Sequence, residues 1–360
     1  MSKCIIIGAG AIGLLSARLL AQAGHEVQII ERGEPGMESS WAGGGILSPL
    51  YPWRYPDSIN QLADYGQQHY PALIQSLRDE TGIDPQLLNS GMLLLDSPEA
   101  GINDWAKQWN HPVKFPTSST ALRAIQPGLS TAYQSATWLP DLKQIRNPRL
   151  MAALLASTKL QSGITITANT PVTGLITDQQ RTTGVRTENG DHHADTVLIC
   201  AGAWSSGLIP DGATKFRRIE PVKGQMLQFQ APPNLLSCMV MENSRYLIPR
   251  KDGLILAGST LEHTEFNKNL TDNAREQLRD FAIGVLPVLA KMPVVNHWAG
   301  LRPGTSQGIP LIGEHPDIAG LYVNAGHFRY GIIIGLASAQ LAVNLITRST
   351  PIFNPADYHL

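Results

Sequence analysis

The stretch KCIIIGAGAIGLL, residues 3–15, runs an apolar strand directly into a glycine-rich turn. Residues 3–7 predict a strand buried on both faces, because β-branched apolar residues follow one another without polar alternation. A helical pattern from about Ile12 to Ala23 comes next, and Glu26 to Glu31 predicts a second strand. The segment therefore has the length and order of a βαβ unit.

The glycines of this turn have separate tasks. Gly8 permits a tight turn, Gly10 lets a pyrophosphate approach the backbone, and Gly13 lets the helix pack close to the strand. Glu31, at the end of the second strand, can accept hydrogen bonds from the ribose hydroxyls of an adenosine. The motif predicts a dinucleotide site, but it leaves FAD and NAD open because both carry the same ADP half.

Three later segments favour FAD. SSWAGGGILSP, residues 39–49, supplies hydroxyls and bare backbone that can reach along an extended dinucleotide. The segment 194–206 predicts a buried strand that ends in small residues at Ala201 to Ala203, where a cofactor can lie against the backbone. Near the end, a strand leads through Gly326 into a long helix that begins near Gly331, and its N-terminus can stabilise negative charge on a reduced flavin. No second G-x-G-x-x-G is present for NADPH, so we expect electrons to leave to oxygen or to another protein.

Composition indicates a globular protein that acts on a small molecule. The chain has 360 residues, 43% hydrophobic and 16% charged, enough for a large core. Its 28 Lys and Arg balance 29 Asp and Glu, and no run of like charge suggests a nucleic acid or a membrane as partner.

The three cysteines, Cys4, Cys200 and Cys238, show neither disulfide nor zinc spacing, so we expect buried thiols in a reducing cytoplasm and no metal. The N-terminus could be taken for a signal peptide, but Arg18 and the continuing helical pattern favour a folded strand and helix. The apolar segment 330–346 is shorter than a membrane span and contains polar residues, so it predicts a buried core helix.

Taken together, these motifs resemble the glycine oxidases of the D-amino-acid oxidase superfamily of flavoproteins. The resemblance spans nearly the whole chain and rests on the order of IIIGAGAIG, SSWAGGGILSP, LICAGAWS, YLIPRKDGLILAGSTLEH, GLRPGTSQGIPLIG and NAGHFRYGI. It implies an α/β Rossmann-type FAD-binding domain of non-contiguous segments, with an antiparallel-sheet substrate domain over the flavin. The hairpin signal at Asp252-Gly253 supports the second domain independently. We expect residues 1–82, 145–214 and 301–360 in the FAD-binding domain, and 83–144 and 215–300 in the substrate-binding domain.

The resemblance also implies the substrate site. Arg302 would bind the substrate carboxylate with help from Tyr246, and Arg329 would lie at the other side of the ligand. The planar guanidinium suits a carboxylate because it presents paired donors, although a surface or ion-paired role is the alternative for an isolated arginine. His327 could be taken for a general base, but the expected hydride transfer needs no protein acid or base, so we assign it to backbone and flavin contacts.

The expected cofactor is noncovalent FAD, because no cysteine lies within residues 298–313, where some relatives attach flavin. Its predicted contacts are Gly8, Gly10, Ala11, Ile12, Gly13, Glu31, Arg32, Ser39, Ser40, Ala42, Gly43, Gly44, Gly45, Val172, Ala201, Gly202, Gly326, His327, Arg329, Tyr330, Gly331 and Ile332. Tyr330 and Leu261 depart from the family pattern, and we expect both to influence pocket size.

The sequence thus predicts an FAD-dependent oxidase that converts glycine, sarcosine or a small D-amino acid to an imine, hence to glyoxylate or another 2-oxo acid, ammonia and hydrogen peroxide. The resemblance further implies a link to thiamine thiazole synthesis and a homotetramer. Two alternatives remain: a dehydrogenase that passes electrons to a partner protein, and a dinucleotide-binding module without catalysis.

Overall fold

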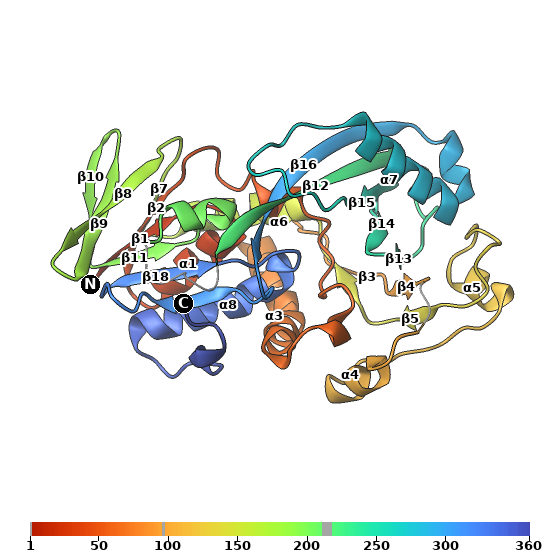
Figure 1. The fold of residues 1–360 in the computed structure, drawn as a ribbon, viewed down its shortest axis with the longest axis horizontal. Helices are drawn as coiled ribbons and strands as arrows, with labels where there is room; N and C mark the ends of the chain where they lie inside the picture. Colours follow the sequence, from red (N-terminus) through yellow and green to blue (C-terminus); the bar gives the residue numbers. More distant parts are fainter. Residues whose placement is uncertain (1, 96–97, 211–217) are drawn as a thin grey trace.

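The computed structural model describes residues 2–95, 98–210 and 218–360, and its two principal sheets stand side by side (Figure 1). The first sheet has six strands in the order β17-β18-β11-β1-β2-β7. All neighbours are parallel except the edge pair β17 and β18. The bounds are β1 Lys3–Ile7, β2 Glu26–Ile30, β7 Ile164–Thr167, β11 Thr196–Ile199, β17 Leu311–Glu314 and β18 Leu321–Ala325.

The predicted βαβ unit is confirmed. β1 occupies the interior of the sheet and pairs with β2 on one side and β11 on the other, as expected for an apolar strand covered on both faces. The connecting helix α1 covers Ala11–Gln22. The carboxyl ends of β2, β1, β11 and β18 therefore meet at one edge of the sheet, where α/β folds bind ligands.

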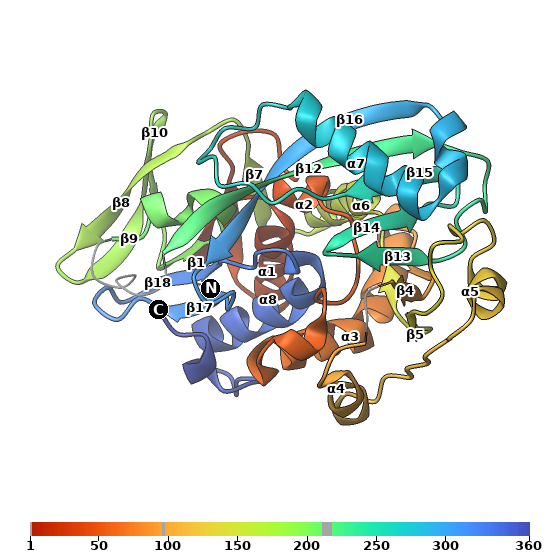
Figure 2. The same cartoon turned by 45° about the vertical axis from the view of Figure 1, so that its right-hand side comes forward.

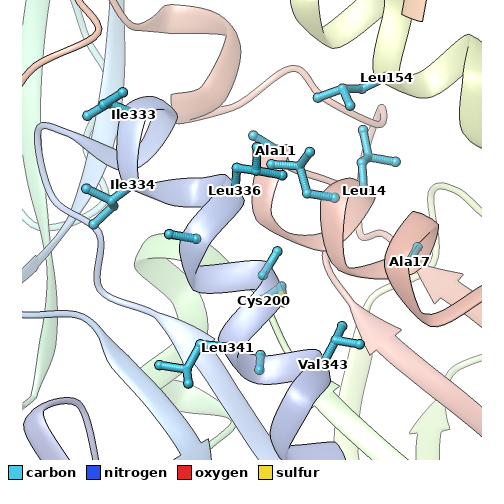
Figure 3. Packing of buried hydrophobic residues seen from close by; sticks show 14 of the residues in the cluster. Ala11, Leu14, Ala17, Leu154, Cys200, Ile333, Ile334, Leu336, Leu341 and Val343 are labelled. Carbon is cyan, nitrogen blue, oxygen red and sulfur yellow. The ribbon is translucent and has the colours of Figure 1, made fainter. Parts of the chain in front are cut away.

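Helices α1 and α8 pack against each other over the sheet (Figure 3). Ala11 and Leu14 of α1 face Leu336 of α8, which spans Gly331–Thr347. A side-chain carbon added at Gly335 of α8 would lie 2.9 Å from Ile12, so glycine permits this close approach. The expected buried C-terminal helix is thus confirmed. Within the three described segments, no helix combines the length and apolar character needed to cross a bilayer.

Two further helices cover the same region, and a small sheet extends from it. Helix α3, Asp57–Thr81, contacts α8, and α6, Asn147–Leu160, contacts α1. The small antiparallel sheet has the order β10-β9-β8. Its strands are β8 Val172–Asp178, β9 Arg181–Thr187 and β10 Gly190–His193.

The second principal sheet has seven strands in the order β16-β12-β15-β14-β13-β4-β5 and lies to the other side of the molecule (Figure 2). It is antiparallel except for the pair β13 and β4. Helix α7, Asp272–Val285, packs on β12 and β15. The strand bounds are β4 Met92–Leu94, β5 Thr137–Leu139, β12 Ile219–Gln230, β13 Met239–Glu242, β14 Arg245–Pro249, β15 Leu254–Gly258 and β16 Val294–Thr305.

The combination of a Rossmann-type sheet with a largely antiparallel sheet confirms the predicted fold class, and β14 and β15 form the expected hairpin at Asp252-Gly253.

The division into domains stays a prediction. Its expected boundary between residues 300 and 301 falls inside β16, and the boundary between residues 214 and 215 lies outside the described residues. The remaining short elements are α2 Ser39–Ala42, α4 Ile102–Gln108, α5 Ser119–Ile125, β3 Leu88–Asn89 and β6 Lys143–Gln144, with 3-10 turns at Pro52–Arg54, Gly202–Gly207, Pro287–Lys291 and Pro355–Asp357.

Candidate active site

A cavity of about 390 Å³ runs along the carboxyl edge of the six-stranded sheet and continues to β12, β14 and β16 of the second sheet. Of the predicted site residues, all but Gly13 and Gly326 line it. Segments that are distant in the sequence thus form one elongated space, as the resemblance implied.

The glycine turn after β1 has the geometry that its sequence predicted. Gly8 has φ +107°, and a side-chain carbon there would lie 2.5 Å from the carbonyl oxygen of Cys200. At Gly13 the added carbon would lie 2.0 Å from the carbonyl oxygen of Gly8, so this glycine brings α1 close to the strand without lining the cavity. Gly10 is the N-cap of α1, and both Gly10 and Ala11 line the cavity.

Glu31 follows β2 and is held by backbone donors. Its Oε2 accepts a hydrogen bond from the backbone N–H of Ala9 at 2.8 Å, and Oε1 accepts one from Gly33 at 3.0 Å. The side chain of Arg32 lies 3.4 Å from the ring centroid of Trp204, a lining residue that sequence reasoning missed. The Glu31 carboxylate, fixed by its two hydrogen bonds to backbone N–H groups, keeps lone pairs for hydroxyl donors in the cavity.

The segment 39–45 lies against the start of α1 and against α6. Ser40 Oγ accepts a hydrogen bond from the backbone N–H of Ala11 at 3.0 Å. Asn147 of α6, which sequence reasoning also missed, donates to the Ser40 carbonyl oxygen at 2.8 Å. Gly45 is obligatory, because an added carbon would lie 2.0 Å from the Ile145 carbonyl oxygen. This close packing keeps the serine hydroxyls and the glycine backbone at the cavity wall.

Gly326 lies in the turn between β18 and α8 and is not among the residues that line the cavity. The residue has φ +88°, and a side-chain carbon there would lie 2.6 Å from Thr305 Cγ2. Glycine is required for the turn between β18 and α8, while the cavity itself is lined by the residues on either side of it. The predicted contact of Gly326 with the cofactor stays a prediction.

Arg302 projects from β16 across the neighbouring strand β12. Its Nη1 donates to the carbonyl oxygens of Lys223 and Thr260 at 3.3 and 3.2 Å, and its Nη2 donates to Ser259 Oγ at 2.8 Å. Burial lowers the pKa of Arg302, Tyr246 opposes this shift, and the nearby positive charge of Arg329 adds to it. No carboxylate forms an ion pair with Arg302 within the described residues, so the alternative of an ion-paired arginine is not what the geometry shows.

Strand β12 leaves space for the Arg302 guanidinium at Gly224. At Gly224 of β12, a side-chain carbon would lie 2.1 to 2.4 Å from the guanidinium atoms of Arg302. The guanidinium therefore lies on bare backbone, with Ser259 fixing one of its nitrogens. Sequence reasoning identified neither Gly224 nor Ser259, because their proximity to Arg302 depends on strand pairing.

Tyr246 on β14 approaches the same space. Its side chain is buried, and its hydroxyl lies 3.9 Å from Met226 Sδ. Tyr246 and Arg302 interact closely enough for Tyr246 to affect the pKa of Arg302, and both line the cavity, so the two polar groups can contact one ligand. Gly44 and Gly258 make room for the ring, since carbons added there would lie 3.2 and 2.7 Å from Tyr246 Cε2.

Arg329 and Tyr330 lie at the start of α8. Arg329 donates from Nη2 to the Ser244 carbonyl oxygen at 3.2 Å. Tyr330 is buried, donates to the Gly308 carbonyl oxygen, and meets the Tyr55 ring edge-on at 5.2 Å, so it shapes the cavity as expected. Leu261 is 50% exposed and is not among the cavity residues, so the predicted influence of Leu261 on pocket size is wrong.

The hydrogen bond and the pKa of His327 do not suit a general base. Nε2 lies 2.6 Å from Ser338 Oγ, and Ser338 donates its hydroxyl hydrogen to Asn324 Oδ1. The Ser338 oxygen can then only accept from the ring, which places the hydrogen on Nε2. Burial lowers the pKa of His327 from 6.5 to about 3, so the imidazole is neutral at physiological pH.

This lowered pKa has a measurable effect on stability. Above pH 6.5 His327 is neutral in both the folded and unfolded chain, but as the pH falls further the unfolded chain alone binds a proton. Between about pH 6 and 4 the free energy of unfolding should fall about 1.4 kcal/mol per pH unit more steeply in the native protein than in His327→Gln. Denaturant unfolding at pH 7, 6 and 5 with saturating cofactor measures this difference. Parallel stability curves for the two proteins would contradict the account.

The family model described as DAO, FAD dependent oxidoreductase, matches residues 3–345. The chain belongs to this FAD-dependent oxidoreductase family. Glycine oxidase from Pseudomonas aeruginosa is 44% identical over 357 residues, covering 99% of this chain and 98% of that protein. Glycine oxidase from Pseudomonas putida is 42% identical over 360 residues, covering 99% and 98%. The crystal structure of glycine oxidase from Geobacillus kaustophilus is 28% identical and matches with a TM-score of 0.91 over 100% of this chain and 99% of that chain.

FAD is thus the cofactor of this chain, and the residues that line the cavity suit a dinucleotide. Carbons added at Gly8 and Gly13 would clash with backbone oxygens, so the turn carries no side chain at these positions, and the start of α1 presents backbone N–H groups suited to phosphate. Two buried lining atoms, Asn147 Oδ1 and Asn324 Nδ2, have no hydrogen-bond partner within the described part of the chain.

Proposed function

We propose that this chain is a glycine oxidase that also accepts sarcosine and small D-amino acids. The observation that carries the proposal is Arg302, a guanidinium held by hydrogen bonds on bare backbone beside Tyr246 in the cavity that fits FAD. Full-length similarity to proteins named glycine oxidase supports it. The FAD contacts predicted from the sequence, Gly13 and Gly326 included, are the proposed contacts of noncovalent FAD.

In this proposal the protein acts by positioning the substrate. The remaining donors of Arg302 and the Tyr246 hydroxyl hold the carboxylate, and the neutral His327 takes no proton from the substrate. FAD, when bound, accepts hydride from the substrate Cα and passes two electrons to oxygen. The imine product takes up water, so glycine, oxygen and water yield glyoxylate, ammonia and hydrogen peroxide.

An anaerobic titration tests this function. The purified protein is mixed separately with glycine, sarcosine and D-alanine while flavin absorbance is followed, and air is then admitted with a peroxide assay. We expect bleaching followed by rapid, stoichiometric peroxide. Bleaching with slow peroxide would indicate a dehydrogenase with a protein acceptor, and no bleaching by any amine would indicate a binding module. Bleaching by an aldehyde or alcohol alone would overturn the amino-acid proposal.

Gly224→Ala should weaken substrate binding without loss of FAD. The new methyl group would displace the Arg302 guanidinium, since the added carbon lies within 2.4 Å of three of its atoms. We expect KM for glycine to rise about tenfold or more, as a misplaced charged hydrogen bond loses about 1.5 kcal/mol or more. Gly174→Ala is the matched control, because β8 leaves open space at that position. An unchanged KM in Gly224→Ala would show that Arg302 does not bind the substrate.

We also propose a cellular setting for this reaction. Similarity to a protein of Trichormus variabilis named Bifunctional protein ThiO/ThiG, at 28% identity over 54% of that protein, supports a supply of product to thiamine thiazole synthesis. The three free, buried cysteines support a cytoplasmic location. The proposed homotetramer rests on resemblance to glycine oxidases, and sedimentation of the FAD-loaded protein tests it.

A further inference from the structure

The segment 39–45, which lines the cavity and carries proposed FAD contacts, is held by two side chains of the seven-stranded sheet. Arg250, the residue after β14, donates from Nη2 to the Gly44 carbonyl oxygen at 2.8 Å. Trp298 of β16 donates from Nε1 to the Ala42 carbonyl oxygen at 3.0 Å. Two backbone groups of one cavity wall are thus fixed by the sheet that carries the proposed substrate residues.

The spacing of these two donors matches that of the substrate residues. Arg250 lies four residues after Tyr246, and Trp298 lies four residues before Arg302. Side chains four positions apart on a strand point to the same face of a sheet, and the pairing of β16 with β12 keeps a regular register over this stretch. Each of the two strands therefore presents one substrate residue and one donor to segment 39–45 from a single face.

The residues between these pairs pack against the same segment, and α2 contacts β16. A carbon added at Gly300 would lie 2.6 Å from Ala42 Cβ. A carbon added at Gly44 would lie 2.7 Å from Ile248 Cδ1 and 3.2 Å from Tyr246 Cε2. Because neither place has room for one more carbon atom, the segment cannot move closer to the sheet, and the two hydrogen bonds keep it from moving away.

Arg250 serves this contact without an ion pair. Its side chain is buried, and Nη1 donates to Gln144 Oε1 at 2.6 Å and to the Ile145 carbonyl oxygen at 3.1 Å. Within the described part of the chain no carboxylate pairs with Arg250, and nearby Asp252 is paired with Arg146 at 2.7 Å. Taking a charge out of water without a counter-charge costs free energy, so fold stability alone does not account for this arginine.

We propose that Arg250 and Trp298 are positioning residues for the oxidation. They set the distance between the FAD-lining segment and the substrate residues on the same two strands. Neither side chain lines the cavity, so each acts through the backbone of the segment. The rate of hydride transfer depends steeply on this distance, because a misplacement of about 1 Å can cost about 10²-fold. The inference rests on the proposed amine oxidation.

Anaerobic reduction of the flavin by glycine tests the proposal, since one titration gives both the limiting rate constant and the Kd for glycine. Trp298→Phe keeps an aromatic ring but removes the N–H donor, and Arg250→Met removes the guanidinium donors. We expect the limiting rate constant to fall about tenfold or more in each variant. The Kd for glycine should stay within about twofold of the native value, because Arg302 keeps its own hydrogen bonds.

Gly300→Ala changes the same distance without removing a donor. The added carbon, 2.6 Å from Ala42 Cβ, would push α2 away from β16, so we expect a similar loss in the rate constant. Trp53→Phe is the matched control for Trp298→Phe, because the Trp53 indole also donates at 3.0 Å, to Glu99, outside the cavity. Its rate constant should equal that of the native protein.

The visible circular dichroism of the oxidised, FAD-loaded protein supplies a readout that needs no substrate. We expect an altered flavin spectrum in Trp298→Phe, Arg250→Met and Gly300→Ala, and a native spectrum in Trp53→Phe. A merely structural role would lower the melting temperature and leave the spectrum and the rate constant of the FAD-loaded protein unchanged, which would overturn the proposal. A Kd for glycine that rises in step with the loss of rate would overturn it too. If glycine failed to reduce the native flavin, the proposed function would fail, and the spectra would still test the positioning of the segment.

Discussion

Arg302→Leu should lower kcat/KM for glycine by about 10²- to 10³-fold while the protein keeps its FAD. Loss of one partner of a buried charge pair costs about 2–5 kcal/mol, and each 1.4 kcal/mol is tenfold. The guanidinium is held by two carbonyl oxygens and by Ser259, all of which remain, so the cavity next to the cofactor keeps its shape. Steady-state kinetics, with the flavin spectrum recorded on the same sample, measures the effect.

Two further variants separate charge from geometry at this position. Arg302→Lys keeps the positive charge but loses the planar pair of donors, so we expect an intermediate loss. Arg279→Leu, on the exposed face of α7, removes a charge of the same kind far from the cavity and should leave kcat/KM unchanged. A native value of kcat/KM in Arg302→Leu would refute the assigned substrate site.

Gly8→Ala should abolish stable FAD binding, with an increase of about 100-fold in the Kd. The added methyl carbon would lie 2.5 Å from the Cys200 carbonyl oxygen, and φ +107° is strained for any residue with a side chain. The turn must therefore move out of the position in which its backbone meets the dinucleotide. Titration of apoprotein with FAD, followed by flavin fluorescence, measures the loss.

Gly33→Ala is the control for this change. It lies near the same edge of the sheet and donates its backbone N–H to Glu31, yet a side-chain carbon there meets open space. Its Kd for FAD should equal that of the native protein. If Gly8→Ala purified yellow and bound FAD normally, the turn would not be the site of the cofactor.

The parts of the site that could be predicted from the sequence are those in which one local segment carries its own chemistry. The glycine turn, Glu31 and the start of α8 each follow a strand within a few residues, and the carboxyl ends of parallel strands meet at one edge. Local pattern was sufficient there because backbone conformation itself forms the site.

The parts that could not be predicted depend on contacts between distant segments. Gly224 and Ser259 reach Arg302 only through the pairing of β12 with β16 and through the chain that follows β15. Asn147 meets Ser40 across 107 positions in the chain. Gly326 and Leu261 are each next to a site motif in the sequence, but a tight turn at Gly326 and an exposed position at Leu261 keep both out of the cavity lining.

The central claim is that Arg302 holds the substrate by its carboxylate. The most direct test compares glycine with methylamine, which is glycine without the carboxylate. The measured quantity is the ratio of their rate constants for anaerobic flavin reduction, in the native protein and in Arg302→Leu. We expect the native protein to favour glycine by about 10³-fold or more, because a site built for a polar group rejects the analogue that lacks it. In Arg302→Leu the ratio should fall toward one, with the methylamine rate little changed. An undiminished ratio in the variant would contradict the account.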